Sequence, residues 1–254
     1  MNWQEIAIDT FTIYYQKNTI AEENIEEIIK KEAQCIDKVC RFLRVDKAFR
    51  LNVYLYPSMT LKKKYMGGSS PGSSNYKTKS VGYVYNKRWI KNIATCHEET
   101  HIYCMLWGGK QVELEGKLIN SLPGLYEGLA MYTQSILYYE YFYRFEQVPP
   151  PKGMTINQSI ISDISQNKAP DVFNVLMYNG YCKNLTNGAQ LGSIVGFIID
   201  TYGLPVFKKI YLYASEDKKL NENIRVFEEI LKKTAKKINE DWKAYVRQHP
   251  HFKL

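Results

Sequence analysis

The sequence predicts an α+β fold, with a small sheet and one long helix in its N-terminal part and helices in the remainder. Two observations support this prediction. Short runs of alternating apolar residues, typical of strands, occur at 6–16, 51–55 and 81–86. From residue 91 onward the apolar spacing is mostly helical. At 254 residues the chain fits one domain of two lobes, which we place at 1–110 and 111–254.

Local patterns predict the N-terminal elements. Phe11, Ile13 and Tyr15 alternate with polar neighbours in the first predicted strand. Residues 21–44 predict an amphipathic helix, because their apolar positions recur every three or four residues. The run 67–75 contains only Gly, Ser, Pro and Asn. Such a segment buries no apolar surface, so we expect a mobile loop there.

The C-terminal elements are predicted to be helices. One covers 91–107 and ends at the pair Gly108-Gly109. The next covers 123–144, with Pro123 suited to its first turn. Further helices are expected at 188–202, 204–214, 221–237 and 239–247.

The helix predicted at 91–107 carries the sequence H-E-E-T-H at positions 97–101. Histidines at i and i+4 leave one face of a helix, so His97 and His101 can bind the same divalent metal ion. Glu98, beside the first histidine, can act as a general base on a water in that site. Glu127 is the natural third ligand, because a carboxylate on a mostly apolar helix needs a partner. Three protein ligands leave the fourth tetrahedral position open, which is typical of catalytic zinc.

The segment 122–132, L-P-G-L-Y-E-G-L-A-M-Y, resembles the third-ligand helix of gluzincin metallopeptidases, which often reads P-x-W-L-x-E-G-x-A-x-Y. The stretches 192–203 and 238–242 are also similar to these proteins, and the closest resemblance is to the peptidase MA-like family. It implies a zincin (thermolysin-like) fold, with a small N-terminal sheet lobe over a helical C-terminal lobe, as a single catalytic domain over 1–254. It also implies that His97, His101 and Glu127 bind Zn2+ and that Glu98 is the catalytic base.

The resemblance further implies how a substrate is held. In gluzincins an edge strand at the place of residues 81–86 pairs with the extended substrate backbone, which points to Gly82, Tyr83 and Val84. Residues 82–86 read G-Y-V-Y-N where aminopeptidases have G-A-M-E-N. The carboxylate that would bind a free substrate amino terminus is therefore absent, and we expect an endopeptidase.

Besides zinc, the developing oxyanion needs a second stabilising group. The resemblance implies that this group comes from the C-terminal lobe, where gluzincins often use a tyrosine. The tyrosine usually found just before the helix at 192 is replaced, since residues 188–191 read G-A-Q-L. The candidates are Tyr178, Tyr181 and Tyr202, and we favour Tyr181 as a catalytic residue.

We therefore expect a zinc-dependent metallopeptidase that hydrolyses peptide bonds in a peptide or protein substrate. Two alternatives stay open. One is a zincin-fold protein that binds a partner without catalysis. The other is a basic cell-wall or nucleic-acid binder with structural zinc, although structural zinc usually takes four Cys or His ligands.

Composition sets the remaining expectations. The net charge is +8, yet the lysines form short clusters outside any recognisable nucleic-acid module, so no nucleic-acid partner is expected. Five cysteines without a C-x-x-C pair predict buried reduced thiols. No apolar run reaches about 18 residues, so no transmembrane segment is expected. The first 20 residues do not read as a signal peptide. We expect a cytoplasmic monomer, or a secreted protein whose signal peptide has been removed.

Overall fold

The computed structural model describes residues 3–88, 95–114, 117–137, 156–166, 168–169, 171–177 and 185–249. The chain divides into two compact units, Met1–Leu106 and Trp107–Leu254. The first unit combines a sheet with helices, and the described residues of the second unit are mostly helical. The prediction of a mixed α+β chain with a small N-terminal sheet and a helical C-terminal part is therefore confirmed.

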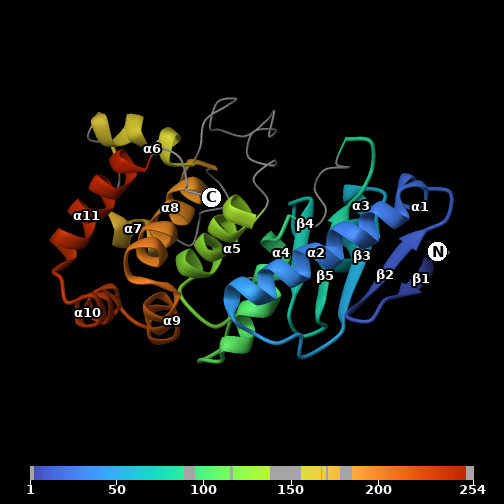
Figure 1. The fold of residues 1–254 in the computed structure, drawn as a ribbon, viewed down its shortest axis with the longest axis horizontal. Coiled ribbons are helices and arrows are strands. Elements are labelled where there is room, and N and C mark those ends of the chain that lie inside the picture. The colour runs from blue at the N-terminus through green and yellow to red at the C-terminus, as the bar shows by residue number, and fades with distance from the viewer. Residues whose placement is uncertain are drawn as a thin grey trace. The chain divides into compact units, whose positions relative to one another are not determined.

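A five-stranded sheet organises the first unit (Figure 1). Its strands are β1 (Trp3–Ala7), β2 (Phe11–Gln16), β3 (Leu51–Tyr56), β4 (Gly72–Asn75) and β5 (Ser80–Val84). They lie in the order β1-β2-β3-β5-β4. The central strands β2, β3 and β5 are parallel, and the outer strands β1 and β4 run antiparallel to their neighbours.

One predicted strand and one predicted loop need correction. The segment 6–16 holds two strands rather than one, because the chain turns back at residues 8–10 to form the β1–β2 hairpin. The segment 67–75 is not simply a loop, because its last four residues form β4. Side-chain patterns cannot reveal this strand, since its ordering comes from backbone pairing with β5.

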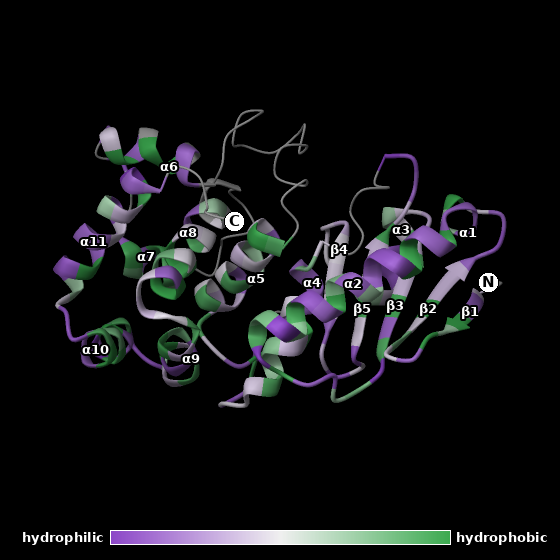
Figure 2. Cartoon of the chain, in the orientation of Figure 1, coloured by the Kyte–Doolittle hydropathy of each residue, from purple (hydrophilic) through white to green (hydrophobic). Residues whose placement is uncertain are grey.

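The helix predicted at 21–44 is confirmed as α1 (Ile20–Glu23) and α2 (Ile25–Leu43), interrupted at Asn24. The buried residues of α2 recur at helical spacing: Ile28, Glu32, Cys35, Ile36, Val39, Cys40 and Leu43. Its ribbon is accordingly banded purple and green in Figure 2. Glu32 and Cys35 lie near Tyr83 of β5, so the buried stripe of α2 packs toward the sheet.

Tyrosine rings pack on the other face of the sheet. Tyr14 and Tyr54 are partners across β2 and β3 and alternate with residues on the α2 side. Their rings stack with centroids 4.7 Å apart. The row continues through Tyr56 to Tyr65 of α3 (Met59–Met66), a helix that the sequence analysis does not predict. Part of the high tyrosine content therefore serves packing within this unit.

The helix predicted at 91–107 is shorter than expected in the described residues. α4 spans His97–Tyr103, and a 3-10 turn continues from Cys104 to Trp107. Cys96 has a φ of 65°, in the left-handed region, so no helix runs through it into α4. Residues 89–94 lie outside the described residues.

The second unit contains one short hairpin and a set of helices. The hairpin pairs β6 (Val112–Leu114) with β7 (Lys117–Ile119). The helices are α5 (Pro123–Leu137), α6 (Ile156–Ser165), α7 (Val172–Met177), α8 (Leu185–Tyr202), α9 (Leu204–Tyr213), α10 (Leu220–Leu231) and α11 (Ala235–Gln248). The predicted helix 221–237 is too long, because Lys232 takes a φ of 55° after α10 and Thr234 caps α11.

Helix α8 is the centre of the second unit. Its buried Ser193 accepts a hydrogen bond from the Trp242 indole of α11 at 3.1 Å and donates to Asn157 Oδ1 of α6 at 2.7 Å. Helix α5 packs closely along α8 at Gly128, where a Cβ atom would lie 2.7 Å from the Leu191 carbonyl oxygen. This close packing fixes the helix that carries Glu127.

Two compositional expectations can be compared with the described residues. Cys35, Cys40, Cys96 and Cys104 are buried thiols, as predicted, whereas Cys182 lies outside the described residues. No helix in the described part of the chain has both the length and the apolar character needed to cross a membrane.

Candidate metal centre

Helix α4 places two imidazoles on one face. His97 and His101 stand one turn apart, and their Nε2 atoms are separated by 3.2 Å. Two nitrogen ligands held about 2.0–2.1 Å from a tetrahedral zinc ion lie about 3.3 Å apart. The two histidines therefore already have the spacing that such an ion requires. Their rings are nearly perpendicular, at 89°, so both nitrogens can point at one centre.

The start of α4 is specified locally. Cys96 occupies the position before the helix with left-handed backbone, and its carbonyl oxygen accepts hydrogen bonds from the Thr100 amide and hydroxyl. His101 is 1% exposed, while His97 is only partly buried. One ligand is thus enclosed, and the other lies near solvent.

Glu127 lies on α5, a helix whose residues are mostly buried. Its side chain is 6% exposed. Two glycines allow α5 to approach its neighbours: Gly128 meets α8, and Gly124 meets α7, where a Cβ atom would lie 2.4 Å from the Leu176 carbonyl oxygen. A side chain at position 124 would therefore clash with the backbone of α7.

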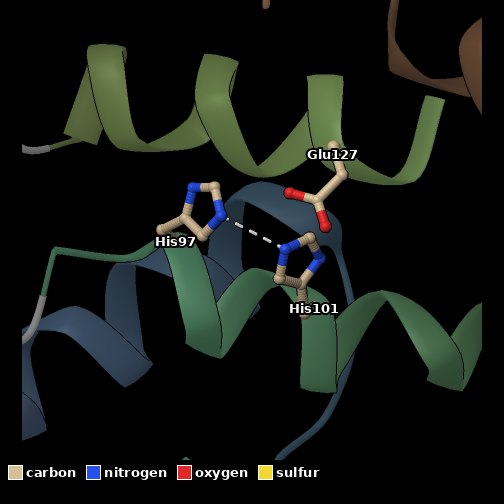
Figure 3. Close-up of side chains that lie close together, drawn as sticks. All are labelled: His97, His101 and Glu127. Atoms are coloured by element: carbon tan, nitrogen blue, oxygen red, sulfur yellow. Dashed lines mark hydrogen bonds between the residues drawn. The ribbon is translucent and has the colours of Figure 1, made fainter. Parts of the chain in front are cut away.

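His97, His101 and Glu127 form a group in which each residue offers one ligand atom, and these atoms lie within 4.8 Å of one another (Figure 3). Two imidazoles and one carboxylate are the donor set of a zinc site with an open fourth position. The residues therefore fit a catalytic zinc ion.

The Glu98 side chain lies against strand β4. A Cβ atom on Gly72 of β4 would lie 2.6 Å from Glu98 Oε1, so the carboxylate occupies the space that the glycine leaves open. Glu98 is 8% exposed, and its Oε2 atom has no hydrogen-bond partner among the described residues. A buried oxygen of this kind can accept a proton or a hydrogen bond from a molecule in the site.

Glu99, the next residue, is fully buried within the first unit. Burial raises the pKa of its carboxyl group, and the hydrogen bond that it accepts from the Tyr83 hydroxyl partly opposes this rise. Tyr83 is 1% exposed, and burial likewise raises the pKa of its hydroxyl. The Glu99–Tyr83 contact connects α4 to β5.

The structure contradicts the expectation that residues 81–86 form an edge strand, whereas a substrate-binding role of Gly82, Tyr83 and Val84 stays a prediction. These residues belong to β5, which pairs with β3 on one side and with β4 on the other, so β5 is not an edge strand. The edge position belongs to β4. Sequence reasoning missed it because the strand has only four residues, of sequence G-S-S-N, without an apolar pattern. The one signal was its place directly before the β5 pattern.

The tyrosine predicted to stabilise the oxyanion, Tyr181, lies outside the described residues, and so does the alternative Tyr178. Tyr202, the lesser candidate, ends α8 and packs its ring edge against Phe197.

No protein-family model matches the chain, and no curated protein matches its sequence. Among solved structures, the fold is similar to the crystal structure of a two-domain M1 zinc metallopeptidase, a Glu-to-Ala mutant bound to L-arginine. The identity is 12% and the TM-score 0.47, over 96% of this chain and 50% of that protein. The chain thus spans about half the length of that metallopeptidase.

Proposed function

We propose that the chain is a zincin-fold, zinc-dependent metallopeptidase, with the single catalytic domain extending over 1–254. The observation that carries this proposal is the group of His97, His101 and Glu127, with the two Nε2 atoms 3.2 Å apart on α4. These three residues would hold Zn2+. When bound, zinc lowers the pKa of its water toward about 7 and polarises the scissile carbonyl group.

Glu98 is the proposed general base. It follows His97 directly, and its carboxylate is buried with one oxygen that no described residue satisfies. In the proposed reaction this carboxylate takes a proton from the attacking water and delivers it to the nitrogen of the leaving amine. The carboxylate of Glu99 is the weaker candidate for this role, because its side chain is 0% exposed and its Oε1 atom accepts the Tyr83 hydroxyl hydrogen bond.

Among the described residues, strand β4 forms the sheet edge next to α4, and it packs against α4 as well as β5. Unpaired backbone groups of an edge strand can bind a substrate by adding a strand to the sheet. The side chains of β4 supply no carboxylate for a substrate amino terminus. We therefore propose cleavage within chains, by an endopeptidase.

The test combines metal analysis with one substitution. The purified protein should contain about one zinc ion per chain and cleave members of a mixed peptide library. Glu98→Gln should keep the zinc and the fold but lose hydrolysis by about a hundredfold or more, because a Gln amide cannot take the proton of the water.

Glu99→Gln is the matched control for this experiment. It changes the same chemical group one residue away, and its amide oxygen can still accept the Tyr83 hydrogen bond. It should stay within about threefold of the parent, since general-base catalysis is untouched. Full activity in Glu98→Gln would reject the assignment of the base, and a protein without zinc affinity would reject the metal centre.

A further inference from the structure

Lys62 is a fully buried lysine in the first unit. It lies on α3 with 0% exposure, although the two lysines that follow it on the same helix are exposed. A lysine ammonium is almost never completely buried unless hydrogen-bond acceptors replace its water. Its surroundings therefore indicate a specific role for the charge.

The Lys62 ammonium joins two separate parts of the chain. It donates to the Gly67 carbonyl oxygen at 3.0 Å and to the Ser73 hydroxyl oxygen. Gly67 ends α3, and Ser73 lies in β4, so both ends of the connection 67–73 are held by one group. An ammonium group suits this task because it has three donors, and hydrogen bonds from a charged donor are stronger than neutral ones.

The opposite face of β4 meets the proposed base. Successive side chains of a strand point to opposite faces, so Ser73 faces Lys62 while Gly72 faces the other way. On that other face Gly72 abuts Glu98 Oε1. Strand β4 is short, with four residues, and among the described strands it pairs with β5. Besides this ladder and the packing against α4, the Lys62 ammonium holds β4 from the face opposite Glu98.

We infer that Lys62 is a positioning residue for the reaction. Its ammonium holds β4 in the position at which Gly72 packs against the Glu98 carboxylate and limits where that carboxylate can lie. The effect on activity rests on the proposed peptidase function. The effect on β4 does not, because the hydrogen bonds to Gly67 and Ser73 are present whatever the chain catalyses.

The experiment compares Lys62→Met with Lys63→Met, its exposed neighbour on α3. Ser73→Ala is a milder second variant that keeps the charge and removes one acceptor. Amide hydrogen exchange is measured over 67–75, and kcat and KM are measured per folded, zinc-loaded molecule. In Lys62→Met we expect exchange in β4 to rise about tenfold or more and kcat to fall about ten- to a hundredfold, by more than KM rises. Ser73→Ala should change both quantities in the same direction, and Lys63→Met should change neither.

The possible failures are distinguishable. Unchanged exchange in β4 of Lys62→Met and Ser73→Ala overturns the inference, whether or not the protein cleaves peptides. Faster exchange with a parental kcat also overturns it, because Lys62 would then be only structural. If the parent chain cleaves no peptide at all, the proposed function fails, while the exchange data still decide whether Lys62 holds β4.

Discussion

Gly72→Ala tests the contact between β4 and the proposed base. The new Cβ atom would lie 2.6 Å from Glu98 Oε1 and 3.3 Å from its Cδ atom. Ordinary van der Waals contact begins at 3.4 Å. Since the nearest atom is the end of a flexible side chain, the carboxylate can turn away while the strand stays paired. We therefore expect a folded protein with a displaced base.

The size of the effect follows from this geometry. The Glu98 oxygen must move by about 0.8 Å to restore ordinary contact with the new methyl group. A misplacement of about 1 Å in a catalytic group can cost about a hundredfold in rate. A positioned general acid or base contributes about a hundred- to ten-thousandfold to the reaction rate. Glu98→Gln removes the base altogether, so the loss of rate in Gly72→Ala should not exceed the loss in Glu98→Gln. Gly72→Ala should therefore lose about a hundredfold in kcat and be no worse than Glu98→Gln.

The assay measures kcat on a verified peptide, the zinc content and the melting temperature. Gly188→Ala in α8 is the control, because among the described residues its Cβ atom would meet the Met131 methyl carbon at an ordinary 3.7 Å. It should retain parental activity, and as a helical Gly-to-Ala change it should be neutral or stabilising by up to about 1 kcal/mol. A Gly72→Ala protein that keeps its zinc and cleaves within about threefold of the parent would refute the reasoning.

Two further predictions concern the substrate and the oxyanion. A peptide blocked at its amino terminus should be cleaved at least as well as a free-amine aminoacyl reporter, because β4 carries no carboxylate; a strong preference for the free amine would contradict this. Tyr181→Phe should lower kcat by about a hundredfold or more with little change in KM, since losing one oxyanion donor costs about 2.7–4 kcal/mol. If Tyr178→Phe is the crippled variant instead, the role moves to Tyr178.

The sequence predicted the elements that carry a periodic apolar pattern. Helix α2 was predicted because its buried stripe repeats at helical spacing, and α5 was confirmed through Leu137 for the same reason. The two histidines of α4 could be placed on one face from their spacing alone, since helix geometry over five residues is local.

The parts that were missed depend on contacts distant in sequence. Strand β4 has no apolar residue, and its order comes from pairing with β5 and from the Lys62 ammonium. The burial of Lys62 gave no sequence signal, because it stands in a run of three lysines that reads as solvated surface. The edge-strand error had the same origin, since β5 is internal only because β4 exists.

The two adjacent glutamates of α4 show how the environment separates residues that the sequence makes equal. Successive helical residues are about 100° apart, so Glu98 and Glu99 leave the helix in different directions. Glu99 enters the buried region beside Tyr83, where burial raises the pKa of its carboxyl group and its Oε1 atom accepts the tyrosine hydroxyl hydrogen bond. Glu98 meets a glycine instead, while the Oε2 atom of each glutamate has no hydrogen-bond partner among the described residues. Exchanging a proton with a reacting molecule requires access to that molecule, and of these two glutamates Glu99 is 0% exposed whereas Glu98 is 8% exposed and follows His97 directly.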